Sequence, residues 1–267
     1  MPNLPKEIYG SSMVQHNENT FLVGGSSNHQ KCLQLVHGTW KEHSVLNFER
    51  SFHSAVTAQN TAFVFGGYGS RGTYEYLPKD STTWLKGKNF IRSGFCNVFA
   101  IAVKSDQEIW LIGGNYPNGN RILSFNVNDH TFQNLPLQLI VGRSKAKCAF
   151  IPNTKKVMIT GGIGRRESGS GYLNSTEILD PEDGTVTMAS PMNSKRADHG
   201  IGVFTINGKD RLAVFGGYDG ANGRYLDSIE FYNPLTEKWE LSDIKLNEPK
   251  HCVGFLTAKL SDFISKL

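Results

Sequence analysis

An apolar run that ends in two glycines occurs five times in this chain and constrains the fold more than any other feature. The runs are FLVGG (21–25), FVFGG (63–67), WLIGG (110–114), VMITGG (157–162) and LAVFGG (212–217). The first glycines of successive pairs are 42, 47, 48 and 55 residues apart, and such a period indicates one supersecondary unit repeated around a common core. A glycine pair after a strand is typical of a backbone that turns with positive φ or approaches a neighbour too closely for a Cβ atom. We therefore expect each pair to connect two strands.

The sequence around each pair predicts the same four strands, here called a to d. Strand b carries the glycine pair, strand a precedes it, as at residues 200–206, and strand c follows it, as at 228–233. The turns between c and d, such as DPEDG and NPLTEK, are rich in residues that bond locally and tolerate turn geometry. Strand d carries a large side chain seven residues beyond that of strand c, as Trp239 follows Tyr232. The sequence therefore predicts an all-β chain of four-stranded units.

The pattern resembles the kelch repeat, which combines an apolar run, two glycines, a strand with Glu and Tyr, and a Trp in the fourth strand. The fifth unit matches it at Arg196, His199, Gly216, Gly217, Glu230, Tyr232 and Trp239. The resemblance implies a β-propeller of four-stranded blades around a central channel. We expect a single domain over residues 1–267, with repeats at about 8–46, 50–86, 92–136, 143–190 and 196–242 and a partial one at 249–267.

The number of blades is left open between two alternatives. Residues 249–258 resemble another strand a, but no sixth glycine pair follows them. We expect five complete blades and a reduced sixth, and the alternative is a compact five-bladed ring. A free edge exposes backbone donors and acceptors that another chain can satisfy. A second copy of the chain could therefore complete the last blade and form a homo-oligomer.

Arginine is concentrated beside two kinds of connection. Strand a begins and strand b ends at the same rim of a propeller, so the d-to-a and b-to-c connections build one face. Arg50, Arg92, Arg143 and Arg196 precede strand a, whereas Arg71, Arg121, Arg165, Arg166 and Arg224 follow the glycine pairs. The b-to-c connections also carry Tyr68, Tyr116, Tyr172 and Tyr218. Because Arg and Tyr dominate binding hot spots, these residues are the predicted ligand-binding surface.

An alternative role exists for the arginines before strand a, because they belong to the kelch pattern and serve blade packing. Where they do bind, the partner is expected to be an acidic protein or peptide, since guanidinium holds carboxylate through two parallel hydrogen bonds. The resemblance points the same way, because kelch domains of ubiquitin-ligase adaptors bind acidic degron peptides on this rim. Other kelch domains bind actin, and the sequence does not choose between these partners.

Enzymatic function is not expected. The copper-binding Tyr and His set of galactose oxidase cannot be assigned here, and the E-x-x-x-D-x-x-x-H iron motif of nitrile-specifier proteins is absent. We expect no catalytic residue, metal or cofactor. The alternative function is a carbohydrate-active propeller of the sialate-mutarotase type, whose sites use scattered Arg and Glu.

Charge and hydropathy indicate the compartment and exclude two kinds of partner. The net charge of +4 is modest and no dense basic run occurs, so nucleic acid is not an expected partner. No apolar stretch approaches the roughly 18 residues of a membrane span, and the start, MPNLPKEIYG, lacks the zones of a signal peptide. We expect a cytoplasmic protein without a membrane partner.

Three other residue types recur in the repeats. Glu75, Glu177 and Glu230 share one position in strand c, and we interpret them as ties between strands rather than acid–base catalysts, because a buried carboxylate needs partners. His53, His199 and His251 each lie three residues after Arg50, Arg196 and Glu248, which predicts one shared position for the three histidines. The four cysteines are expected to be reduced thiols.

Overall fold

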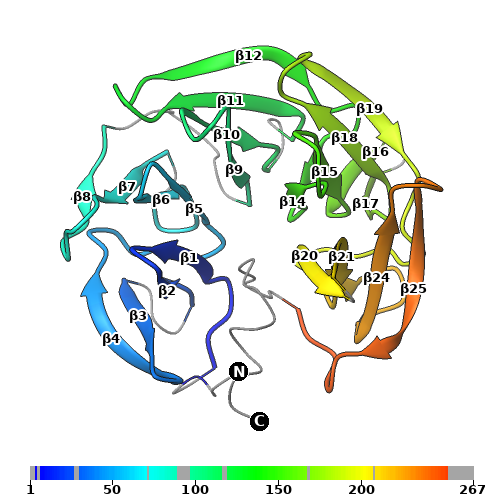
Figure 1. The fold of residues 1–267 in the computed structure, drawn as a ribbon, viewed down its shortest axis with the longest axis horizontal. Coiled ribbons are helices and arrows are strands. Elements are labelled where there is room, and N and C mark those ends of the chain that lie inside the picture. The colour runs from blue at the N-terminus through cyan, green and yellow to red at the C-terminus, as the bar shows by residue number, and fades with distance from the viewer. Residues whose placement is uncertain are drawn as a thin grey trace. The chain divides into compact units, whose positions relative to one another are not determined.

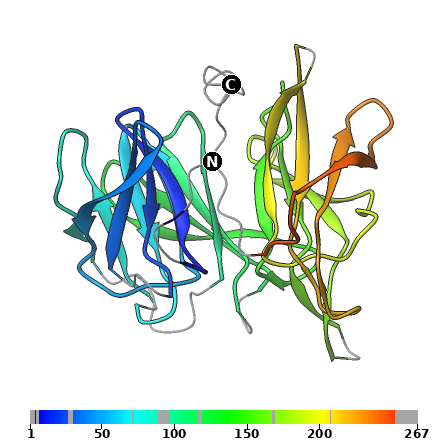
Figure 2. The ribbon, with the colours of Figure 1, turned by 90° about the horizontal axis from the view of Figure 1, so that it is seen from below.

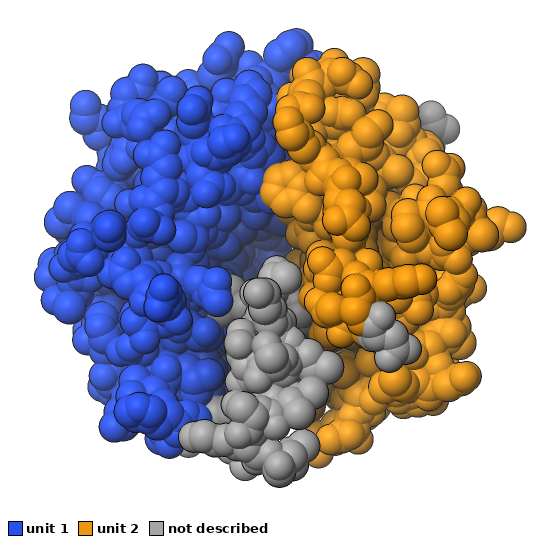
Figure 3. Space-filling model, viewed as in Figure 1, with its two compact units in different colours: residues 1–136 blue, residues 137–267 orange. Residues whose placement is uncertain are grey.

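The computed structural model describes residues 4, 7–26, 30–70, 72–88, 97–115, 119–166, 169–206 and 208–251. These residues form strands and their connections, and no helix among them is long and apolar enough to cross a membrane. The chain divides into two compact units, residues 1–136 and 137–267 (Figure 3).

Unit 1 consists of three antiparallel sheets of four strands each, which pair in chain order (Figure 1). The first sheet contains β1 (Ser12–His16), β2 (Asn19–Val23), β3 (Lys31–Val36) and β4 (Thr39–Val45). The second contains β5 (Ser54–Ala58), β6 (Thr61–Phe65), β7 (Tyr74–Leu77) and β8 (Leu85–Lys86). The third contains β9 (Phe99–Val103), β10 (Glu108–Ile112), β11 (Arg121–Asn126) and β12 (Phe132–Gln138). Successive first strands are in contact, β1 with β5 and β5 with β9.

Unit 2 contains two further four-stranded sheets. One is built from β14 (Lys147–Phe150), β15 (Val157–Thr160), β18 (Thr176–Asp180) and β19 (Thr185–Ala189). The other is built from β20 (Gly200–Ile206), β21 (Lys209–Phe215), β24 (Ser228–Asn233) and β25 (Lys238–Lys245). The b-to-c connections form small sheets of their own, from β13 (Arg143–Ser144), β16 (Ile163–Arg166) and β17 (Gly169–Tyr172), and from β22 (Tyr218–Asp219) and β23 (Arg224–Tyr225).

The prediction of an all-β chain built from four-stranded antiparallel sheets is confirmed. The spacing between strands c and d is confirmed as well, because Tyr232 lies directly opposite Trp239 and Leu179 opposite Val186. Both Tyr232 and Trp239 are buried, with ring centroids 5.4 Å apart. The partial last repeat lies outside the described residues from Cys252 onward, so the five-bladed and six-position alternatives both stay predictions.

The glycine pairs are explained by Gly161 and Gly162, whose φ angles are 57° and 95°. Gly161 N–H donates to Ser175 O at the start of strand c, whereas Gly162 N–H donates to Arg196 O before the next sheet. A Cβ atom on Gly161 would lie 2.3 Å from the Arg196 carbonyl oxygen. Because positive φ and close approach coincide, only glycine fits this position without strain.

The outer strands carry features that protect exposed sheet edges. The pairing register of β3 with β4 shifts between Cys32 and Leu33, and that of β24 with β25 shifts between Ser228 and Glu230. β12 contains Pro136, which has no backbone N–H. Bulges and proline are common devices against edge-to-edge pairing, so these outer strands are poor templates for a further strand.

Candidate functional site

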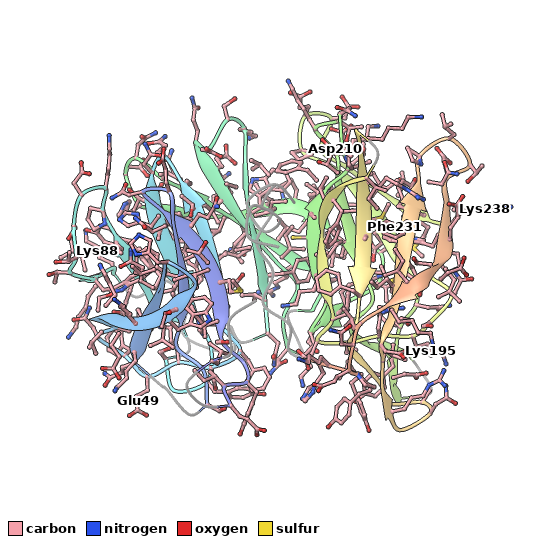
Figure 4. All side chains as sticks on the ribbon, turned by 60° about the horizontal axis from the view of Figure 1, so that its bottom comes forward. Glu49, Lys88, Lys195, Asp210, Phe231 and Lys238 are labelled. Carbon is pink, nitrogen blue, oxygen red and sulfur yellow. The ribbon has the colours of Figure 1, made fainter. Side chains whose placement is uncertain are left out.

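The d-to-a and b-to-c connections of each unit meet at one end of the sheets, called here the rim of that unit. Isolated bridges pair Ser51 with Tyr68 and Ala197 with Tyr218. Each bridge joins a d-to-a connection to a b-to-c connection. Figure 2 shows the strands of each unit with their connections gathered at the two ends. In Figure 4, Lys195 marks the rim of unit 2, and Asp210, near the start of β21, lies at the opposite end.

Three of the predicted arginines, Arg50, Arg143 and Arg196, have side chains with no exposed surface. Each guanidinium donates to the first glycine of its own repeat's pair and to the strand-c glutamate. Arg196 Nη1 is 2.8 Å from Gly216 O, and its Nη2 is 2.6 Å from Glu230 Oε1. These three guanidinium groups bond within the repeats and are not exposed to a ligand. They therefore fit the alternative role, which is packing within the repeats.

The glutamates complete this interior network. Glu230 also accepts hydrogen bonds from the backbone N–H groups of Asn193 and Ser194, at 2.6 and 3.1 Å. Glu75 is bonded in the same way by Asn47 and Phe48, and Glu177 by Ile140 and Val141. Burial lowers the pKa of each arginine, and the neighbouring carboxylate acts in the opposite direction. The glutamates therefore tie strand c to the connection that precedes strand a of the same repeat.

A residue with positive φ lies two positions before the first strand of each four-stranded sheet. These residues are Gly10, Phe52, Asn97, Lys145 and Asp198, here called the collar residues. In unit 1 the N–H of Phe52 donates to Gly10 O, and the N–H of Asn97 donates to Phe52 O. In unit 2 the N–H of Asp198 donates to Lys145 O at 3.1 Å. Main-chain hydrogen bonds thus link the beginnings of successive sheets.

This register corrects the prediction for His251. Gly217 N–H donates to Lys250 O, as Gly162 N–H donates to Arg196 O, so Lys250 takes the arginine position of the next repeat. His251 therefore follows that position directly and does not share the position of His53 and His199. The prediction failed because no sixth glycine pair anchors the register. In the first repeat, the same register places Ile8 at the arginine position and Leu33 at the glutamate position.

The rim of unit 2 carries a row of aromatic side chains, here called the tyrosine row: Tyr172, Tyr218, Tyr225 and His251. The ring centroids of consecutive members are 5.6, 5.1 and 4.5 Å apart, and the last pair is stacked. Tyr225 is 51% exposed. Arg224 lies beside it on β23 and is exposed. The rim of unit 2 therefore carries an accessible aromatic surface and, at the neighbouring position of β23, an exposed cationic side chain.

The inner end of the tyrosine row is held in place by packing. A Cβ atom on Gly220 would lie 1.9 Å from the Tyr172 ring, so the glycine lets the chain lie against the ring. Burial is the main cause that raises the pKa of Tyr172, and Tyr218 raises it further. Asp198 also raises this pKa, whereas Lys145 lowers it. Lys145 Nζ is 2.9 Å from Asp198 Oδ2. An ion pair therefore lies close to Tyr172.

The structure brings together only some of the predicted site residues. Tyr172, Tyr218 and Arg224 share the rim of unit 2. In unit 1, Tyr68 is exposed beside Phe52, and Arg121 is exposed at the start of β11. Arg71, Arg92 and Tyr116 lie outside the described residues, as do the side chains of Arg165 and Arg166.

Sequence reasoning missed four residues of the rim of unit 2: Tyr225, His251, Lys145 and Asp198. Tyr225 adjoins Arg224 in the sequence and was within reach of the same argument. The collar residues carry no shared side-chain type, so nothing in the sequence pattern marks them. Within the described ranges, no group of three or more His, Cys, Asp or Glu residues could hold a metal ion, and the expected absence of a metal stays a prediction.

Comparison with known proteins places this architecture among its relatives. The family model described as the Kelch motif matches residues 208–241. The chain is 25% identical over 253 residues to Kelch-like protein 23 of Mus musculus and of Homo sapiens, which covers 90% of this chain and 42% of each relative. It is 23% identical over 245 residues to a RING finger domain and kelch repeat-containing protein of Dictyostelium discoideum, covering 90% of this chain and 23% of that protein. The chain thus spans less than half the length of these relatives.

Proposed function

Because residues 208–241 match the Kelch motif and 90% of the chain is similar to Kelch-like protein 23, we propose that this chain binds an acidic peptide or protein segment on the rim of unit 2, as a non-catalytic interaction module. The proposal rests on the tyrosine row, which offers exposed aromatic surface next to Arg224. Tyr and Arg together are the residue types that most often dominate interfaces. The described arginines that are buried against glutamate take no part in it.

The energies favour a mixed aromatic and ionic contact. A solvent-exposed ion pair contributes roughly 0.2 to 1 kcal/mol, whereas micromolar affinity needs about 8 kcal/mol. Charge alone is therefore insufficient, and apolar burial against Tyr218 and Tyr225 has to supply the larger part. The expected ligand carries Asp or Glu next to an apolar residue.

The cellular role that fits this chemistry is that of a recognition adaptor in the cytoplasm. The name of the Dictyostelium relative combines a RING finger domain with kelch repeats, which supports substrate recognition for a ubiquitin ligase over the alternative of actin binding. In either role the chain would supply the binding surface, and other parts of the assembly would supply activity.

The test is a selection from a displayed library of linear peptides, followed by calorimetric titration of the best binders. We expect enrichment of Asp and Glu, and loss of binding when these residues are changed to Asn and Gln. Tyr225→Ala or Arg224→Ala should weaken binding by about ten-fold or more, as expected for hot-spot residues. Arg211→Ala is the matched control, because Arg211 lies on β21 and pairs with Glu240 away from the rim. Selected peptides without acidic residues, or equal affinity for the Arg224 and Arg211 variants, would contradict the proposal.

A further inference from the structure

The last member of the tyrosine row is a histidine. His251 is exposed, and its ring lies over that of Tyr225, with the two centroids 4.5 Å apart and an angle of 22° between the ring planes. Backbone hydrogen bonds place it there, because Lys250 N–H donates to Leu226 O at 3.1 Å and Gly217 N–H donates to Lys250 O at 2.7 Å. The stack therefore depends on the same register that joins Lys250 to the glycine pair.

This stacked geometry can accommodate a positive charge. Imidazole is the side chain that gains a proton between pH 8 and pH 5. A cation over the face of a tyrosine ring, within about 6 Å of the centroid, is attracted by the quadrupole of the ring. Protonation of His251 is therefore compatible with its contact to Tyr225, and it adds a positive charge to the exposed part of the row.

The segments beside His251 carry four charged side chains, which form two ion pairs. Residues 245–250 are hydrogen-bonded to residues 226–227. The pairs are Glu248 with Lys250 and Asp227 with Lys245, each with 3.5 Å between nitrogen and oxygen. Because the charges cancel within each pair, these two segments together have no net charge.

The hairpin of β22 and β23 contributes one exposed cation and one buried carboxylate. Arg224 is exposed. Asp219 is buried, and its carboxylate accepts hydrogen bonds from Ala221 N–H at 3.1 Å and from the Asn222 side-chain amide at 2.6 Å. This carboxylate is therefore bonded within its own turn. Protonation of His251 thus increases the positive charge that an acidic ligand meets on the row.

We propose that His251 makes ligand binding on the rim of unit 2 depend on pH, because an acidic ligand binds more tightly when the histidine is protonated. This inference rests on the proposed function and adds a residue that contacts the ligand. Carboxylates of the ligand remain ionised well above pH 4, so the charge that changes between pH 7.5 and pH 5.8 is that of the protein. Affinity for acidic ligands therefore rises as the pH falls through this range.

The direct test is calorimetric titration at pH 7.5 and pH 5.8 with the acidic peptide selected on the wild type. We expect the affinity of the wild type to rise by about three-fold or more at the lower pH, the size of one exposed ion pair. The rise should shrink as ionic strength increases from low salt to about 0.15 M, because salt screens exposed charges. Circular dichroism at both pH values would verify that the protein is folded in each titration.

Two substitutions of the histidine separate its charge from its stacking. His251→Phe keeps an aromatic ring against Tyr225 but cannot gain a proton, so its affinity should agree within about two-fold at the two pH values. His251→Arg carries a permanent charge on a group that also stacks on aromatic rings. It should bind at pH 7.5 as tightly as the wild type binds at pH 5.8. A rise in His251→Phe as large as that in the wild type would overturn the inference.

His37→Asn is the matched control. His37 is exposed in the turn between β3 and β4, at the end of its sheet away from the rim of unit 1. Its φ angle is 47°, and Asn tolerates positive φ. This variant should keep the full rise in affinity between the two pH values. Loss of the rise in His37→Asn would show a general effect of histidine charge and contradict a specific role of His251.

The outcomes distinguish this inference from the proposed function. If the peptide binds the wild type through Arg224 but with equal affinity at both pH values, the role of His251 fails and the proposed function stands. If the wild type binds no acidic peptide at either pH, or binds without Arg224, the proposed function fails and the role of His251 fails with it.

Discussion

At the scale of single residues, the main finding is that arginines before strand a and arginines after a glycine pair have different environments. Arg143 and Arg196 are buried against glutamate, whereas Arg224, which follows a glycine pair, is exposed. Arg224 and Arg196 belong to the same repeat, but only Arg196, which precedes strand a, reaches the strand-c carboxylate of Glu230. The sequence contains a signal for this pairing, because Ile8 and Leu33 replace both partners together in the first repeat.

Removing one member of a buried ion pair should destabilise the protein strongly. We expect Glu230→Gln to lower the free energy of unfolding by about 3 to 5 kcal/mol, because Arg196 would remain charged and buried without its carboxylate. Chemical denaturation of this variant and of Glu182→Gln, a change at an exposed glutamate, would measure the difference. The double variant Arg196→Ile with Glu230→Leu copies the first repeat and should be more stable than Glu230→Gln alone. Equal stability of Glu230→Gln and wild type would show that the ion pair contributes nothing.

His199 should make stability depend on pH. Burial, followed by Arg196, holds the pKa of His199 well below the ordinary value of 6.5, and its Nε2 lies 2.7 Å from Thr160 Oγ1. Below about pH 6.5, His199 is therefore protonated in the unfolded chain but stays neutral in the folded chain. Stability should be highest above that pH and decline by up to about 1.4 kcal/mol per pH unit below it.

Denaturation of wild type and His199→Gln at pH 7.5 and 5.5 would isolate this contribution, because other histidines titrate in both proteins. The wild type should lose more stability on acidification than the variant. An identical loss in the two proteins would remove His199 as the cause.

At the scale of elements, the sequence pattern predicted the strands well because their determinants are local. A glycine pair, an apolar run and a turn rich in Asp, Asn, Pro and Gly define each strand and its ends. The register at residues 248–251 was not predictable in this way. It is fixed by a backbone hydrogen bond from Gly217 to Lys250, a contact between repeats that leaves no mark on the residue types.

The effect on stability of the close approach at Gly161 can be measured separately from the effect of its positive φ angle. Gly161 and Gly184 have φ angles of 57° and 64°, but a Cβ atom would meet the Arg196 carbonyl at the first and nothing within 4 Å at the second. Both Ala variants should lose about 1 to 2 kcal/mol to the left-handed conformation. Gly161→Ala should lose more, because the backbone of the next repeat has to move. Equal melting temperatures of the two variants would show that the contact relaxes freely.

At the scale of the whole molecule, the repeated fold follows from the sequence, whereas the binding surface follows only in part. The repeats predicted which connections build the rim, and three of the predicted residues, Tyr172, Tyr218 and Arg224, lie together there. Tyr225 and His251 extend the tyrosine row through stacking that depends on tertiary structure. The proposed ligand preference therefore depends on residues that the repeat pattern does not specify.

The collar residues show how such a fold separates support from recognition. Glycine, phenylalanine, asparagine, lysine and aspartate all have positive φ there, and backbone hydrogen bonds from Phe52 to Gly10, from Asn97 to Phe52 and from Asp198 to Lys145 link successive sheets. Since the scaffold draws on no side chain for these links, mutation can rewrite these five positions without dismantling the framework. A new ligand preference can arise there at little cost to folding.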